Sequence, residues 1–147
     1  MSRINYSAIE DAISAQLLAD ATVAAGGTKV FVEEAISSVE GRQVFIYLER
    51  RDMPDNMQSL SAGKAERSLL RFSIWCYGST LEGSRASMSR RDQLLGEVEI
   101  ALMKDRTLGG TVIKSWLNGG EFRSGMADDF YMCGAEIVLI ADVKATY

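Results

Sequence analysis

Residues 68–77, which read SLLRFSIWCY, limit the possible folds more than any other segment of this chain. Apolar side chains alternate along them, which predicts a β-strand, because successive side chains of a strand point to opposite faces of a sheet. One face carries Leu70, Phe72, Ile74 and Cys76. The opposite face carries Leu69, Arg71, Ser73, Trp75 and Tyr77. Because both faces hold large apolar groups, the strand is expected to be covered on both sides.

The other periodic segments predict an α+β fold around this strand. Further strands are expected at 29–33, 43–50, 112–117 and 131–144, and helices at 7–20 and 82–104. Ser7 and Glu10 fit a capping box at the start of the first helix. The order α–β–β–β–α–β–β lacks regular βα alternation, so we expect a mostly antiparallel twisted sheet with two helices packed on one face. The 147 residues are expected to form a single domain, 1–147.

Two connections have a distinctive composition. Residues 51–67 are polar and include Pro54 and Gly63, which predicts a long loop, and such loops are often functional. Residues 118–120, Asn-Gly-Gly, allow either a hairpin turn or a bulge within a longer strand. We favour the bulge, because it leaves room for a long hairpin that closes at residues 125–129.

The sequence lacks the residues that most catalytic and metal sites need. It contains no histidine, which removes the commonest general base and the commonest metal ligand together. No GxxxxGK[ST], GxGxxG or GxSxG motif occurs, so no phosphate loop or nucleophile elbow is predicted. We therefore expect no enzyme activity, no catalytic residue, no cofactor and no metal. Cys76 and Cys133 fall in predicted strands and are interpreted as buried thiols in a reducing compartment.

The charged residues indicate surfaces rather than sites. A net charge of −4 disfavours a nucleic-acid-binding module, whose affinity comes from many Lys and Arg contacts. Glu33-Glu34 and Asp128-Asp129 are interpreted as turns or solvated edges, and Arg90-Arg91 as part of a solvated helix face. Glu136 lies within an apolar strand, either as an inward-pointing charge on an edge strand or as an intersubunit ion-pair partner. The apolar runs are too short to predict a transmembrane helix.

The order and spacing of these elements resemble the lambda-type tail terminator family of long-tailed bacteriophages. The similarity covers residues 7–144 and includes the polar loop at 51–67. Its segments are VFVEE (30–34), VFIYLE (44–49), RSLLRFSIWCYG (67–78), the helix at 81–103, MADD (126–129) and AEIVLIADVKATY (135–147). The resemblance lies in the sequence of elements, because no single peptide among them is diagnostic.

This resemblance implies a structural virion protein of the tail or neck that is assembled in the host cytoplasm. Such proteins form hexameric rings that cap the tail tube, stop its polymerisation and join the tail to a head-side connector or stopper protein. DNA passes through the channel without specific binding, and no membrane is involved. Six copies at −4 each would carry −24, a charge that would keep DNA from adhering to the channel wall.

Two groups of residues are expected to make contacts in such a ring. The second faces of the strands at 44–48 and 69–77 offer aromatic anchors between subunits, unless these residues lie beneath the helices. They are Phe45, Tyr47, Trp75 and Tyr77. The 51–67 loop is expected to contact a neighbouring ring of the tail. Its candidate polar contacts are Arg50, Arg51, Asp52, Lys64, Glu66 and Arg67.

Three other functions fit the sequence less well. A head-side stopper or tail-completion protein is also small and ring-forming, and its sequence would look much the same. A small-ligand-binding α+β domain would be a monomer or dimer with a closed apolar pocket. An enzyme with a carboxylate-based site would lose activity when Glu33 or Asp128 is changed, and the absence of histidine makes it the weakest of the three.

Overall fold

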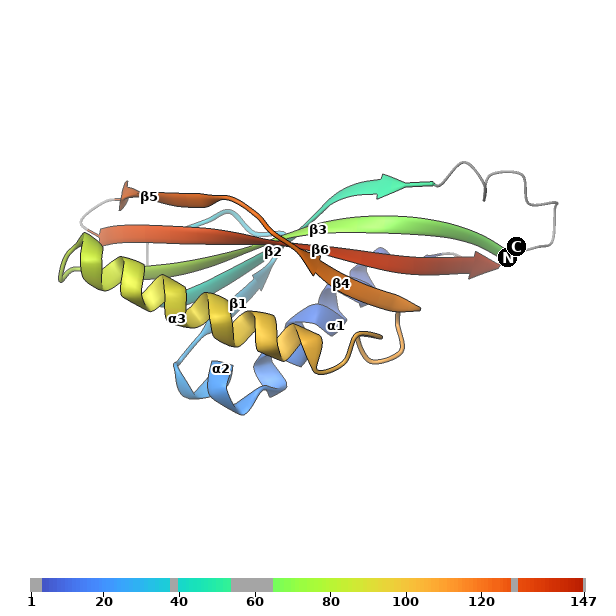
Figure 1. Ribbon diagram of the computed structural model, residues 1–147, viewed down its shortest axis with the longest axis horizontal. Helices are drawn as coiled ribbons and strands as arrows, with labels where there is room; N and C mark the ends of the chain where they lie inside the picture. Colours follow the sequence, from blue (N-terminus) through green and yellow to red (C-terminus); the bar gives the residue numbers. More distant parts are fainter. Residues whose placement is uncertain (1–3, 38–39, 54–64, 128–129, 147) are drawn as a thin grey trace.

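The computed structural model describes residues 4–37, 40–53, 65–127 and 130–146, which form a six-stranded mixed sheet with three helices on one face (Figure 1). The helices are α1 (Tyr6–Ala19), α2 (Ala21–Ala25) and α3 (Ser84–Met103). The strands are β1 (Lys29–Val32), β2 (Gly41–Asp52), β3 (Ala65–Thr80), β4 (Lys114–Asn118), β5 (Phe122–Ala127) and β6 (Phe130–Thr146). The predicted α+β class is confirmed, with one helix and one strand more than the sequence indicated.

The sheet is built around the long antiparallel pair of β3 and β6. These strands pair from Ala65 opposite Thr146 to Thr80 opposite Tyr131. The strand order is β1–β2–β3–β6–β4, and β5 also pairs with β6. Only β1 and β2 run parallel among the described strands, so the mostly antiparallel prediction is confirmed.

β4 and β5 form one interrupted strand along the outer side of β6. β4 pairs with residues 138–142 and β5 with residues 130–135. Between them, the carbonyl oxygens of Gly119 and Glu121 accept hydrogen bonds from Val138 N–H (3.3 Å) and Glu136 N–H (2.7 Å). The predicted bulge is therefore confirmed, and a hairpin turn at 118–120 is excluded. The predicted closure of the long hairpin falls partly at residues 128–129, outside the described residues.

The predicted loop at 51–67 is shorter than expected, because strands extend into it from both sides. β2 continues through a register irregularity between Leu48 and Arg50 and still pairs with β3 at Asp52. β3 begins at Ala65 and pairs with the end of β6. Residues 54–64 lie outside the described residues. The boundaries were wrong because polar residues on paired strands resemble a loop in composition.

The first helix is capped two residues earlier than the sequence pattern suggested, at Asn5 rather than Ser7. Asn5 is the N-cap residue, and its side-chain oxygen accepts a hydrogen bond from Ala8 N–H at 3.1 Å. The Ser7 hydroxyl donates to the same oxygen at 3.0 Å. The capping box at Ser7 and Glu10 was therefore wrong: both residues lie inside the helix, and Glu10 is buried.

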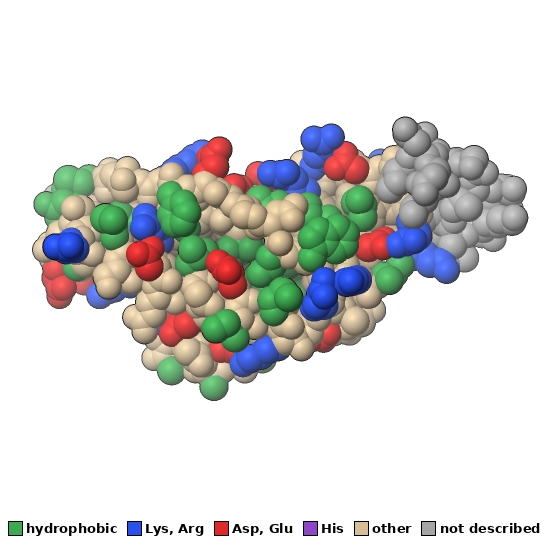
Figure 2. Space-filling model, in the orientation of Figure 1, with side chains coloured by type: hydrophobic (Ala, Val, Ile, Leu, Met, Phe, Trp, Pro, Cys, Tyr) green, Lys and Arg blue, Asp and Glu red, His purple; other side chains and the backbone are tan. Residues whose placement is uncertain are grey.

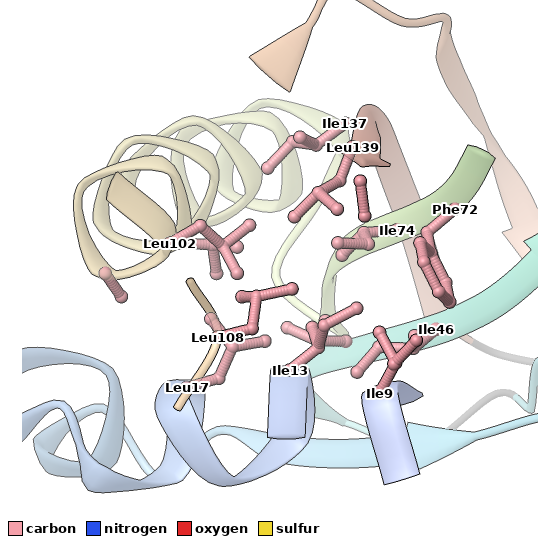
Figure 3. Packing of buried hydrophobic residues seen from close by; sticks show 14 of the residues in the cluster. Ile9, Ile13, Leu17, Ile46, Phe72, Ile74, Leu102, Leu108, Ile137 and Leu139 are labelled. Carbon is pink, nitrogen blue, oxygen red and sulfur yellow. The ribbon is translucent and has the colours of Figure 1, made fainter. Parts of the chain in front are cut away.

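The main core lies between the helices and the sheet (Figure 3). Side chains from α1, the central strands, α3 and the segment after α3 meet there. Those labelled in the figure are each at most 2% exposed: Ile9, Ile13, Leu17, Ile46, Phe72, Ile74, Leu102, Leu108, Ile137 and Leu139. This face of β3 is the Leu70–Cys76 face that the alternation predicted.

A second short helix joins α1 to β1 and was not predicted. Asp20 starts it by accepting hydrogen bonds from Thr22 N–H (2.9 Å) and Val23 N–H (3.1 Å). Asp20 also forms an ion pair with Lys104 at the end of α3, with Nζ 2.5 Å from Oδ2. The Lys104 hydrogen bond is the main cause of a lowered pKa for Asp20, followed by the hydrogen bond from Val23 N–H. This carboxylate therefore ties α2 to α3.

α3 approaches the sheet very closely at Gly78. The Ser87 hydroxyl donates to the carbonyl of Gly78 and accepts from Cys133 N–H at 2.9 Å. Arg90 and Arg91 also turn inward, so their interpretation as a solvated face was wrong: Arg90 donates to the carbonyl of Ser79 at 2.8 Å, and Arg91 is 8% exposed. No described helix, α3 included, has the length and apolar composition to cross a membrane.

Candidate assembly interface

The face of the sheet opposite the helices carries a row of aromatic rings, in which two successive contacts are stacked and the one between Phe45 and Tyr77 is edge-to-face. We define the aromatic row as Phe31 of β1, Phe45 of β2, and Tyr77 and Trp75 of β3. Successive ring centroids lie 5.0, 6.0 and 5.9 Å apart. Arg123 of β5 completes the row, with its guanidinium carbon 4.7 Å from the centroid of the Trp75 ring. The row thus crosses the sheet from its β1 side to its β5 side.

A glycine in β6 allows the row to cross that strand. Gly134 lies opposite Tyr77, and a Cβ atom at Gly134 would meet Cε1 of the Tyr77 ring at 2.4 Å. The tyrosine ring therefore occupies the space that any larger residue would fill. Met132 of β6 packs against the same cluster. The aromatic row is a second, smaller core on the side away from the helices.

All four residues predicted for the subunit interface lie on this face. The alternative that they lie beneath the helices is wrong, because β2 and β3 turn the other alternate set of side chains toward the helices. Phe45 is 1% exposed, and Trp75 and Tyr77 are 7% exposed, within a single chain. Tyr47 is only partly buried. A subunit contact at this face stays a prediction. In it, the buried Phe45, Trp75 and Tyr77 would stiffen the face, and Tyr47 would offer accessible surface.

Tyr47 connects this face to the segment between β1 and β2. Its hydroxyl donates a hydrogen bond to the carbonyl of Glu34. Burial is the main cause of a raised pKa for Tyr47, followed by the nearby Tyr77, Glu33 and Glu34. Tyr47 therefore remains a protonated hydrogen-bond donor, and the segment after β1 is held against the aromatic side of the sheet.

Replacing Arg123 by glutamine should lower the free energy of unfolding by about 0.5–1 kcal/mol, because the guanidinium then no longer covers the Trp75 ring. Urea denaturation followed by tryptophan fluorescence would measure the change. Arg85→Gln is the matched control, since Arg85 is an exposed arginine on α3. Equal losses in the two variants would contradict a specific contribution of the Arg123–Trp75 contact.

The residues predicted to contact a neighbouring ring lie mainly in strands. Arg50, Arg51 and Asp52 end β2, and Glu66 and Arg67 begin β3, so their assignment to a loop was wrong. Lys64 lies outside the described residues. Arg50 pairs with Asp52 at 2.8 Å, and Arg51 donates to the Tyr6 hydroxyl at 2.9 Å.

Arg67 is the most strongly held of these residues. Its guanidinium binds both carboxylate oxygens of Asp142 on β6, with Nε 3.1 Å from Oδ1. Such a two-pronged pair fixes the arginine side chain. Arg50 and Arg51 of β2 are exposed cations at this end of the described sheet, as is Lys144 of β6 opposite Arg67, so a polar contact with a partner there would involve these residues.

Glu136 and Glu33 accept hydrogen bonds within the chain, and both cysteines are buried in it. Glu136 accepts a hydrogen bond from the Ser73 hydroxyl, and β6 lies between β3 and β5, so the edge-strand interpretation of Glu136 was wrong. Glu33 accepts from Leu48 N–H at 2.8 Å. Cys76 and Cys133 are buried free thiols, and burial raises the pKa of Cys76. Among the described residues, no three His, Cys, Asp or Glu side chains gather as a metal site would require.

Sequence reasoning missed a carboxyl pair between α1 and the end of β1, in which Glu10 is buried and Glu33 is exposed. Glu10 is 7% exposed, and its Oε2 has no hydrogen-bond partner among the described residues. Burial, the hydrogen bond with Glu33, and the charges of Glu33 and Asp11, in that order, raise the pKa of Glu10 to about 7. The only signal in the sequence was the position of Glu10 beside Ile9, on the buried side of the helix.

A groove of about 710 Å³ lies between α1, α2 and the end of α3. Its apolar lining is mostly alanine, from Ala12, Ala15, Ala19, Ala21 and Ala101. The Gln16 amide donates to the carbonyls of Ala101 (3.0 Å), Leu102 (3.1 Å) and Asp105 (3.1 Å). Gln16 therefore satisfies the open end of α3. Because Lys104 and Asp20 are also paired across this region, the groove is a weak candidate for a polar ligand.

Comparison with known proteins gives a likeness of fold. No family model matches the chain, and no curated protein matches it. Among solved structures, the chain is similar to one from the virion of a native gene transfer agent (GTA) particle, with a TM-score of 0.52 and 17% sequence identity. The match covers 92% of this chain and 93% of that one. The chain therefore shares its fold, over nearly its whole length, with a component of a gene transfer agent virion.

Proposed function

We propose that this protein is a structural virion protein, a ring-forming tail terminator that caps the tail tube and stops its polymerisation. In this role it also joins the tail to a head-side connector, and DNA passes through its channel. The observation that carries the proposal is the likeness of fold to a gene transfer agent virion chain over 92% of the sequence. The order of sequence segments that resembles lambda-type tail terminators supports the narrower assignment.

The surfaces of the chain are compatible with assembly. A sheet that is packed on both faces is stiff, and a stiff subunit keeps its shape when copies are joined in a ring. The net charge of −4 per chain would disfavour adhesion of DNA to the channel. Exposed Arg50 and Arg51 at the end of β2 could bind acidic groups on the neighbouring tube ring.

A head-side stopper or tail-completion protein of the neck is the main alternative. It would bind portal-side rings rather than tube ends. The small-ligand-binding alternative would use the alanine-lined groove, whose polar side chains Gln16, Asp20 and Lys104 are already bonded within the chain. The tail terminator assignment therefore remains the proposal that these features favour.

Mixing the purified protein with tail tubes should place a ring at one end of each tube, visible by negative-stain electron microscopy. The physical reason is that a terminator binds the growing end of the tube and leaves no surface for another tube subunit. Tube length should then stop increasing when free tube protein is added. Binding to portal-side rings and none to tubes would instead support the stopper alternative.

A variant that lacks residues 54–63 would test the connection between β2 and β3 in the same experiment. Tube binding should weaken if the connection between β2 and β3 contacts the neighbouring ring. The double substitution Arg85→Gln and Glu82→Gln changes exposed charges near the start of α3 and serves as a control. Unchanged tube binding and unchanged tube length in the deletion variant would refute the role of this loop.

A further inference from the structure

The sheet has two edges whose strands each pair on one side within the described chain. β1 pairs with β2 alone, and β4 and β5 pair with β6 alone. In Figure 1, β4 and β5 lie nearest the viewer, and β1 lies on the far side of the sheet. An unpaired strand edge presents backbone N–H and C=O groups that can pair with another chain. The two edges therefore form two potential joining surfaces on opposite sides of one subunit.

The strand directions make these two edges complementary. β1 runs parallel to β2, whereas β3 runs opposite to β2, β6 opposite to β3, and β5 opposite to β6. β1 and β5 therefore run in opposite directions. When a second copy stands beside the first in the same orientation, its β1 would meet β4–β5 as an antiparallel neighbour, the more favourable arrangement. The parallel β1–β2 pair is the feature that produces this match.

The β5 edge exposes large apolar side chains on the helix side of the sheet. Phe122 is 62% exposed and Met126 is 61% exposed. The guanidinium carbon of Arg91 lies 4.9 Å from the centroid of the Phe122 ring and holds it from the α3 side. Figure 2 shows hydrophobic side chains on this side of the molecule, interspersed with charged side chains of both signs. Exposed aromatic residues on a strand edge indicate a contact surface.

Acidic groups predominate near the β1 edge and basic groups at the β4–β5 edge. The exposed charges near the β1 edge are the carboxylates of Glu33, Glu34 and Asp11 and the single cation Lys29. Those at the other edge are Lys114 on β4, Arg123 on β5 and the single carboxylate Glu121, which lies 3.6 Å from Arg123. Arg123 also ends the aromatic row, and the row begins with Phe31 at the β1 edge. A neighbouring copy would therefore bring Phe31 and acidic groups toward Arg123.

We propose that copies of this chain join head to tail, with β1 of one copy pairing antiparallel to the β4–β5 edge of the next. This inference rests on the proposed ring function and specifies the subunit contact of that ring. Each copy uses one edge for each neighbour, so the contact is heterologous and closes on itself when the rotation permits. The sheets would then form one continuous band, with the aromatic rows of successive copies end to end.

The test uses cysteines placed on the two edges. A Lys29→Cys/Gly125→Cys double variant carries one exposed thiol on β1 and one on β5, both on the aromatic side of the sheet, whereas Cys76 and Cys133 are buried. Side chains on the same face of paired strands lie roughly 5–8 Å apart, so a short bismaleimide can span them without a defined register. The variant would be cross-linked after mixing with tail tubes and separated on a denaturing gel. Each single variant is a control.

We expect a ladder of covalent multimers from the double variant and monomers from each single variant. Dimers from Gly125→Cys alone would mean that two β5 edges meet each other, which overturns the proposal. A ring on the tube without a ladder would also overturn the edge contact while leaving the proposed function in place. A ladder without a ring on the tube would support the edge contact and count against the proposed function.

Discussion

A Gly78→Ala variant is expected to lose roughly 2–3 kcal/mol of unfolding free energy, because the added methyl group collides with the backbone of α3. A Cβ atom at Gly78 would lie 2.6 Å from the amide nitrogen of Arg91 and 2.8 Å from the carbonyl oxygen of Ser87. Both atoms belong to the helix backbone, so relief requires the whole helix to move away from β3. A domain of this size has a total stability of about 5–15 kcal/mol, so the loss is large.

The same contact holds a hydrogen-bond junction between the helix and two strands. The Ser87 hydroxyl is buried and bonds to the carbonyl of Gly78, the carbonyl of Tyr131 (3.0 Å) and Cys133 N–H (2.9 Å). Displacement of α3 would weaken these bonds and leave buried backbone groups without partners, which adds to the cost. The expected loss in Gly78→Ala therefore includes both steric overlap and lost hydrogen bonding.

Gly96→Ala is the matched control for this prediction. Gly96 lies within α3, and a Cβ atom there would meet no heavy atom within 4 Å. Alanine is favoured over glycine inside a helix, so this variant should gain roughly 0.5–1 kcal/mol. Urea denaturation followed by circular dichroism would measure both variants. Similar changes in the two would contradict the close approach of α3 to Gly78.

The long strands and helices could be predicted because their side-chain periodicity is strong. Apolar residues alternate from Leu70 to Cys76 in β3 and from Cys133 to Val143 in β6, and α3 carries a helical stripe that includes Leu94, Val98 and Leu102. Large aromatic groups on the second face of β2 and β3 also indicated a sheet covered on both sides. Each of these signals is repeated along an element, so single unusual residues do not hide it.

The features that were missed depend on single contacts between distant residues. Asn5 caps the first helix where Ser7 was predicted. Asn and Ser side chains can both accept a hydrogen bond from an N–H group at the start of a helix, so the sequence does not decide between them. Gly134 makes room for Tyr77, and no pattern in β6 indicates which strand supplies the ring. The charges of Arg51 and Arg67 suggested a loop, although both belong to paired strands. Which residues of the chain contact one another in these cases is determined by the fold and not by local composition.

The candidate assembly interface also combines features that side-chain periodicity predicts with features that depend on contacts between distant residues. Alternation placed the aromatic residues of β2 and β3 on one face, but it did not show whether the helices cover that face. It also did not show that Phe45, Trp75 and Tyr77 are buried within one chain. Two short strands, β1 and β5, place Phe31 and Arg123 at the ends of the aromatic row and turn it into a continuous layer. Because the centre of this layer is buried within one chain, the exposed groups that a neighbouring copy could contact lie at its two edges.

Stability is expected to fall as the pH rises from about 5 to 7, and a Glu10→Gln variant should remove much of that fall. The pKa of Glu10 is raised from its ordinary value of 4.5 to about 7 by burial, by the hydrogen bond with Glu33, and by the charges of Glu33 and Asp11. The folded chain therefore keeps a proton that the unfolded chain releases. The favourable contribution is complete below the unfolded pKa and is lost as the pH approaches the folded pKa.

The expected size of the effect is roughly 2–3 kcal/mol, since one pKa unit corresponds to about 1.4 kcal/mol and part of the charge is screened by solvent. At pH 8 the Glu10→Gln variant should be more stable than the parent, because the amide stays neutral and can donate to Glu33. Urea denaturation between pH 5.5 and 8 would measure the slope. Glu99→Gln, which changes an exposed glutamate on α3, is the control for net charge. Parallel pH profiles for the parent and Glu10→Gln would contradict a proton shared between the carboxyl groups of Glu10 and Glu33. In that case a water molecule would have to bind the buried Oε2 of Glu10.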